Sequence, residues 1–112
     1  MLIMSDIIRG YTDTFILAQI LHKDSYGYEI NKAINEMTNG RFELKEATLY
    51  TTFRRLEQGG YIISYWGDEN TGARRRYYAI TEKGKELYYE NLNDWKIAKT
   101  MINQILEDKN DE

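Results

Sequence analysis

The spacing of apolar residues changes at Gly59-Gly60, and this change constrains the fold more than any other feature of the sequence. Before the two glycines, apolar residues recur at three- and four-residue intervals, which is typical of helices that bury one side. After them come two short segments, 61–66 and 75–80, rich in β-branched and aromatic residues, as strands are. An eight-residue polar loop with two glycines separates these segments. The sequence therefore predicts helices first and a β-hairpin after them.

Three helices are predicted in the first sixty residues. The first spans residues 5–22 and is apolar over a wide arc. Ser25 can cap the second helix, and Asn39-Gly40 can end it because both residues tolerate a left-handed backbone. The apolar positions expected on this second helix are Tyr28, Ile30, Ile34 and Met37. The third helix is predicted from about residue 45 and ends at Gly59-Gly60.

A final helix is predicted from Thr81, which can cap its N-terminus, to about residue 108. About 27 residues at 1.5 Å each make a helix of about 40 Å, longer than a domain of this size needs. Its apolar residues recur in alternating steps of three and four, as in a coiled coil. A second copy of the chain is the simplest cover for this stripe. The residues expected at the dimer interface are Tyr88, Leu92, Trp95, Ile102, Ile105 and Leu106.

The order helix, helix, helix, hairpin, helix predicts a mainly α (α+β) fold, a winged helix-turn-helix with a C-terminal dimerisation helix. We expect residues 1–81 to form the winged helix-turn-helix DNA-binding domain. Residues 82–112 should form the dimerisation helix with a frayed tail. In such a fold the third helix enters the DNA major groove, and the hairpin, or wing, lies against the DNA backbone.

The third helix has a side suited to this role. Leu49, Phe53 and Leu56 share the side that a small domain buries. The opposite side carries Ala47, Thr48, Thr51, Arg54 and Arg55, with Tyr50 on its flank. Small side chains permit a close approach to the groove, and longer ones can reach phosphates or a guanine edge. The predicted wing ends in three consecutive cations, Arg74, Arg75 and Arg76, which suit a phosphate backbone.

Composition excludes several other functions. The chain of 112 residues has no Cys and a single His, so disulfides, thiolate metal sites and His-based zinc sites are excluded. No nucleophile pairing, phosphate-binding loop, signal peptide or long apolar run is found. We therefore expect a cytoplasmic protein that is not an enzyme, with no metal, no cofactor and no membrane segment.

Net charge leaves a second hypothesis open. The chain carries a formal charge of −3, whereas nucleic-acid-binding domains are often basic, and Asp68 and Glu69 in the predicted wing oppose phosphate. A winged helix that binds another protein without sensing a ligand is the alternative. Steep salt dependence would identify the DNA-binding protein.

Several motifs resemble the PadR family of transcriptional regulators. They are YGYEI at residues 26–30, ATLYTTFRRLEQGGYIISYW at residues 47–66, and GARRRYYAIT followed by EKGKE at residues 72–86. The likeness covers about residues 8–106, and the single C-terminal helix resembles the small subgroup that includes LmrR-type multidrug-sensing repressors. This resemblance implies a homodimeric repressor that binds a two-fold-symmetric operator in double-stranded DNA.

The resemblance also implies site residues. For DNA contacts it supports Tyr26, Lys45, Thr48, Tyr50, Thr51, Arg54, Arg74, Arg75 and Arg76. In the LmrR-type subgroup a tryptophan from each last helix sandwiches planar aromatic compounds at the dimer centre, and Trp95 matches it. The neighbouring positions would be Ile7, Tyr11, Thr14, Ala18, Leu92 and Lys99.

Two of these residues differ from those that an open drug-binding site would need. Tyr11 is bulky enough to fill the space at the dimer centre, and Lys99 places a cation where an acidic residue would better bind cationic drugs. Simple packing of Trp95 in a dimer interface is the alternative. Trp66, at the start of the predicted wing loop, is expected to pack against the hairpin rather than to bind anything.

Overall fold

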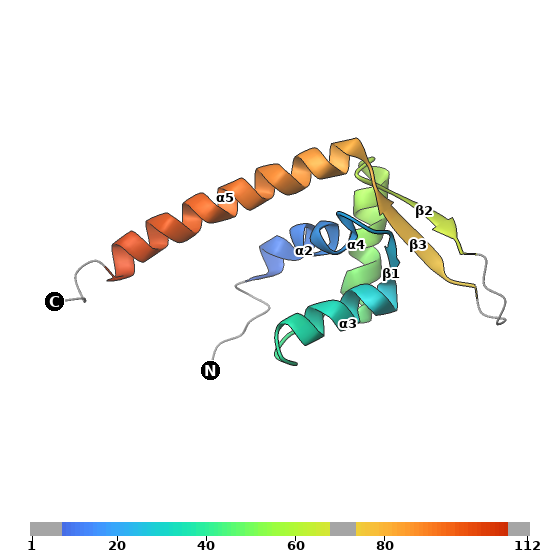
Figure 1. Cartoon of the computed structure of the whole chain (residues 1–112), viewed down its shortest axis with the longest axis horizontal. Helices are drawn as coiled ribbons and strands as arrows, with labels where there is room; N and C mark the ends of the chain where they lie inside the picture. The colour runs from blue at the N-terminus through green and yellow to red at the C-terminus, as the bar shows by residue number, and fades with distance from the viewer. Residues whose placement is uncertain (1–7, 68–73, 108–112) are drawn as a thin grey trace.

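The computed structural model describes residues 8–67 and 74–107, and its element order confirms the predicted winged helix-turn-helix (Figure 1). A short 3-10 helix, η1, leads directly into the first α-helix. The elements are η1 (Arg9–Tyr11), α2 (Thr12–Ile20), β1 (Ser25–Tyr26), α3 (Gly27–Met37), α4 (Glu46–Gln58), β2 (Ile62–Trp66), β3 (Arg76–Ile80) and α5 (Glu82–Glu107). The first α-helix ends two residues before the expected end at residue 22.

The wing belongs to a three-stranded antiparallel sheet of order β1-β3-β2. The hairpin of β2 and β3 was expected, but the two-residue strand β1 was not. The predicted cap at Ser25 is wrong, because Ser25 pairs with Tyr78 in the sheet and α3 begins after Tyr26 without a side-chain cap. The Ser25 hydroxyl instead donates to the carboxylate of Glu29 in the first turn of α3. A two-residue strand has too few residues to show a period.

One apolar core joins the helices to the sheet. Its buried members are Ile16, Leu17, Ile20, Ile30, Ile34, Leu44, Leu49, Phe53, Leu56, Ile62 and Tyr78. The rings of Phe53 and Tyr78 stack with their centroids 3.8 Å apart, which joins α4 to β3. Burying each large side chain contributes about 1.5–3 kcal/mol. The expected buried side of α4, with Leu49, Phe53 and Leu56, is confirmed, and it holds the opposite side of the helix toward solvent.

The predicted end of α3 is confirmed, and its four expected apolar positions divide between the core and the surface. Asn39 and Gly40 adopt left-handed backbones, with φ of 55° and 79°. Tyr28 and Met37, however, are each 71% exposed. They lie at the two ends of α3 and outside the core cluster, whereas Ile30 and Ile34 reach the core.

Helix α5 begins on the domain and then extends away from it (Figure 1). The predicted cap is confirmed, since Thr81 Oγ1 accepts a hydrogen bond of 3.1 Å from the backbone N–H of Gly84. Further along, Asn91 Nδ2 donates to Thr14 Oγ1 of α2 over 3.0 Å. The C-terminal half continues past α2 and gives the chain a longest dimension of 62 Å. Among the described helices, α5 included, none is both long and apolar enough to span a membrane.

Candidate nucleic-acid interface

The exposed side of α4 carries the residues that the sequence proposed for the major groove. Lys45 stands at the N-cap, and Ala47, Thr48 and Thr51 are exposed on the following turns. Thr52, on the other side, is 2% exposed and donates to the carbonyl of Thr48 over 2.8 Å. The side opposite the core therefore exposes three small residues, Ala47, Thr48 and Thr51, while Tyr50 lies exposed on its flank.

Arg54 and Arg55 are adjacent in sequence but differ in their surroundings. Arg55 forms an ion pair with Asp13 of α2, so its guanidinium holds two helices together. No carboxylate in the described part of the chain pairs with Arg54, which is exposed. Arg54 is therefore available to a ligand, whereas Arg55 is already engaged within the domain.

The turn between α3 and α4 is held by Asn31. Its side chain donates to the carbonyl of Leu44 over 2.7 Å and accepts from the N–H of Leu44 over 2.8 Å. Asn35 Nδ2 adds a bond of 3.3 Å to the carbonyl of Phe42. These bonds fix the connection that sets the angle of α4. Sequence analysis missed Asn31, because its partner lies 13 residues away and an Asn within a helix gives no local signal.

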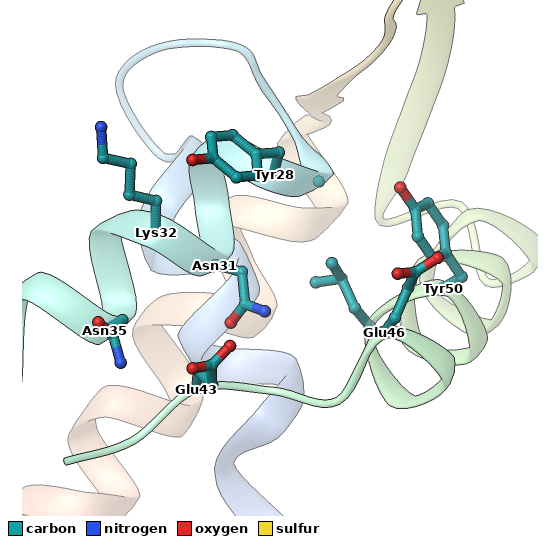
Figure 2. A pocket seen from close by; sticks show the side chains of 9 residues that line it. Tyr28, Asn31, Lys32, Asn35, Glu43, Glu46 and Tyr50 are labelled. Atoms are coloured by element: carbon teal, nitrogen blue, oxygen red, sulfur yellow. The ribbon is translucent and has the colours of Figure 1, made fainter. Parts of the chain in front are cut away.

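A groove of about 320 Å³ lies where α3 meets the start of α4 (Figure 2). Tyr28, Asn31 and Lys32 reach it from α3, and Glu43, Glu46 and Tyr50 reach it from the other side. Tyr50 rests against the start of α3, since a Cβ at Gly27 would lie 2.9 Å from its hydroxyl oxygen. The two carboxylates disfavour a phosphate here. Lys32 offsets part of this negative charge, and further positive charge at the interface comes from Lys45, Arg54 and the wing.

The three wing arginines lie on two faces of the sheet. The guanidinium carbon of Arg75 lies 4.7 Å from the ring centre of Tyr26, which precedes α3. Arg74 and Arg76 instead lie over Trp66, at 5.3 and 5.6 Å. Trp66 is 53% exposed, and its expected packing against the hairpin takes the form of contacts with these two arginines.

Arg76 is also anchored to α4. Its Nη2 donates to Ser64 Oγ over 2.8 Å and lies 3.8 Å from the Glu57 carboxylate. Ser64 Oγ in turn donates to Glu57 over 2.6 Å. This network joins the wing to the last turn of α4, so part of the charge of Arg76 is compensated within the domain. The predicted wing residues 68–73, including Asp68 and Glu69, lie outside the described residues.

Two tyrosines of the sheet have shifted acidities. The hydrogen bond that Tyr65 donates to Asp24 raises the pKa of Tyr65 above its ordinary value. Burial raises the pKa of Tyr78, and the charge of Arg76 opposes that rise. Both side chains therefore stay neutral at physiological pH, and the charge near the wing comes from its arginines. Among the described residues, no group of His, Asp or Glu side chains could hold a metal ion.

The residues suggested for a ligand site lie on α2 and α5. Trp95 is 40% exposed, and Lys99 Nζ lies 5.1 Å from its ring centre. Thr14 contacts α5 through Asn91, and Leu92 is half-buried. Tyr11, at the end of η1, stacks on Phe15 of α2. Ile7 lies outside the described residues.

Ala18 borders a different space from Trp95. It lines an apolar groove of about 670 Å³ between α2 and the end of α3, together with Phe15, Met37 and Phe42. Within one chain, the structure therefore does not gather all the suggested ligand residues around a single cavity.

The outer half of α5 is apolar and exposed. Trp95, Ile97, Met101, Ile102, Ile105 and Leu106 are each between 40% and 73% exposed. Tyr88, nearer the start of the helix, packs against the core of its own chain. The candidate interface residues thus divide into two that are partly buried within the chain, Tyr88 and Leu92, and four that are exposed.

The fold and these surfaces define a winged helix-turn-helix protein. Residues 16–90 match the transcriptional regulator PadR-like family, so the chain belongs to that family, which is one of regulators and not of enzymes. A relative from Lysinibacillus sphaericus, named only as an uncharacterized protein, is 46% identical over 106 residues, covering 95% of this chain and 97% of its own.

Solved structures agree with this assignment. A transcriptional regulator from Clostridium thermocellum is 47% identical, with a TM-score of 0.84, over 92% of this chain and 100% of that chain. Bacillus subtilis PadR, solved in complex with operator DNA, shares the fold at 21% identity. Its TM-score is 0.65, over 72% of this chain and 46% of that one.

Proposed function

We propose that the chain is a sequence-specific DNA-binding repressor that acts as a homodimer in the cytoplasm, where α4 enters the major groove of an operator. The observation that carries the proposal is the contrast along α4. Opposite its buried side, α4 exposes the small residues Ala47, Thr48 and Thr51 and then the guanidinium of Arg54, which has no acidic partner among the described residues. The family and the operator complex of the Bacillus subtilis relative support the same function.

The proposed contacts divide by chemistry. Thr48 and Thr51 lie where they can meet base edges, and Arg54 can reach a guanine edge or a phosphate. Lys45 and Tyr50 flank the start of α4. We expect the cations of Arg74, Arg75 and Arg76 to lie beside the DNA backbone, with the ring of Tyr26 in contact with Arg75. The Glu57 carboxylate, 3.8 Å from Arg76, offsets part of the charge of that arginine.

Dimerisation is proposed through α5, with residues 1–81 as the DNA-binding domain and residues 82–112 as the dimerisation segment. A helix of 26 residues is about 39 Å long, and its outer half has no cover within the described chain. An exposed apolar stripe of this kind marks an interface. A symmetric dimer fits an operator with two-fold symmetry, since two copies of α4 must lie about 34–36 Å apart to enter successive major grooves.

A planar aromatic effector is proposed to bind at Trp95 in the dimer. The partly exposed ring of Trp95 on α5 supports this site. The ammonium group of Lys99 lies over that ring and disfavours a cationic effector. An effector between two copies of Trp95 would change the spacing of the recognition helices. It could weaken DNA binding only through different affinities for the two dimer shapes.

The test is fluorescence anisotropy with a labelled duplex of about 30 base pairs, long enough for two half-sites, taken from immediately upstream of the chain's own gene. We expect binding that exceeds that of a scrambled duplex and that weakens steeply between about 50 and 200 mM salt. Arg54→Ala and Arg75→Ala should each weaken it. Equal, salt-insensitive binding of both duplexes would instead favour a winged helix that binds another protein.

A further inference from the structure

Trp66 ends β2 at the base of the wing, directly opposite Arg76 in the strand register. Its ring is 53% exposed and carries the guanidinium groups of both Arg74 and Arg76 within 5.6 Å of its centre. Both distances fall in the range of cation–π contacts. One exposed ring therefore gathers two of the three wing cations.

The two arginines depend on this ring to different extents. Arg76 is held independently by Ser64 and Glu57. Arg74 lies two residues before β3 begins at Arg76, outside the strand pairs of the described residues. Among the described residues, the contact recorded for the Arg74 guanidinium is the Trp66 ring. Removing the ring should therefore release Arg74 and leave Arg76 in place.

We propose that Trp66 is a positioning residue for DNA binding, whose ring holds the Arg74 guanidinium at the wing in a conformation that meets phosphate. This inference rests on the proposed DNA-binding function. A long arginine side chain loses rotamer freedom when it binds, and a side chain that is already ordered loses less. Trp66 thereby increases affinity without adding charge to the interface.

The experiment is a double-mutant cycle between Trp66→Leu and Arg74→Ala, measured by anisotropy with the duplex that the wild type binds. The cycle isolates the interaction between the two side chains. Trp66→Leu should weaken binding about fivefold in the wild-type background, as loss of cation–π contacts predicts. In the Arg74→Ala background the same change should alter affinity less than about twofold.

Tyr65→Leu is the matched control, because it removes an aromatic ring of similar exposure from the same strand. Tyr65 contacts Tyr77 and Asp24 and belongs to the opposite face of the strand. This control should leave the affinity unchanged. An equal loss in both Arg74 backgrounds, or a loss as large in Tyr65→Leu, would overturn the role of Trp66. If the wild type binds no duplex, the proposed DNA-binding function is wrong. If the wild type binds and Trp66→Leu binds equally well, only the positioning role of Trp66 is wrong.

A second measurement does not depend on the folding of the leucine variant. The chain has two tryptophans, so Trp95→Phe leaves Trp66 as the sole tryptophan. Saturating duplex should change the Trp66 emission, because the ring and its arginine move from water to the DNA surface. Unchanged emission at full DNA occupancy would place the wing away from the duplex and overturn the proposal.

Discussion

Gly84 lies directly against the backbone of Tyr61, at the point where α5 joins the winged helix. A Cβ at Gly84 would lie 2.1 Å from the Tyr61 carbonyl oxygen and 2.7 Å from the Ile80 side chain. Around this contact, Thr81 donates to the carbonyl of Gly60 over 2.7 Å, and Lys83 donates to that of Gly59 over 2.8 Å. The glycine turn that ends α4 therefore also anchors the start of α5.

Replacing Gly84 by Ala should destabilise the fold by about 3 kcal/mol, because the added methyl group meets backbone that cannot move aside. Urea unfolding followed by circular dichroism measures this change. Gly10→Ala is the control, since nothing lies within 4 Å of a Cβ at Gly10. A stability for Gly84→Ala equal to that of the wild type would contradict the close approach to Tyr61.

Arg54→Ala should weaken DNA binding about tenfold while leaving the unfolding midpoint unchanged, because Arg54 is exposed and has no acidic partner among the described residues. Anisotropy titration measures the affinity. Lys96→Ala removes the same charge from exposed α5 and should have little effect. Equal losses in the two variants would mean that only net charge matters and that α4 has no special role.

Ile102→Glu should shift the chain from dimer to monomer, because a carboxylate would be buried in the proposed α5 interface without a partner. The dimer Kd should rise by about 100-fold or more. Sedimentation equilibrium measures it directly. Thr100→Glu, which adds the same charge on the opposite side of the helix, is the control. If both variants keep the mass of the wild type, α5 does not form the interface through this stripe.

Trp95→Ala should abolish any response to a planar aromatic effector and spare DNA binding, because Trp95 belongs to α5 and not to α4 or the wing. The measurement is the change in duplex affinity on adding the compound. A full response in the variant would exclude Trp95 as the effector site.

The stability of the fold should decrease as the pH rises above about 10, in part because of Tyr78. Burial raises the pKa of Tyr78 above its ordinary value of 10.0, so the unfolded chain loses this proton first and the folded form is disfavoured. Below pH 10 the contribution of Tyr78 is fully present. Urea unfolding at pH 8 and at about pH 10.5 measures the decrease.

Tyr78→Phe should reduce that decrease, because the variant keeps the stacked ring on Phe53 and has no hydroxyl to ionise. Tyr89→Phe, at a ring that is 54% exposed, serves as the control. The same pH dependence in Tyr78→Phe as in the wild type would assign the effect to other tyrosines among the ten in the chain.

The sequence by itself determined the helices, their glycine ends and the hairpin, because each depends on the spacing and backbone freedom of neighbouring residues. Leu49, Phe53 and Leu56 predicted the orientation of α4 for this reason, and Thr81 predicted the start of α5. The family motifs were also readable in sequence, since residues 16–90 match the family.

Only the tertiary structure decided which of several similar arginines has a partner within the chain. Among the described residues, Arg55 has an acidic partner and Arg54 has none, Arg76 pairs with Glu57, and Arg74 lies over the ring of Trp66. Strand β1 likewise exists because Ser25 and Tyr26 meet β3, more than fifty residues further along the chain. Such contacts join distant segments, and no local period or propensity specifies which side chains meet when those segments pack.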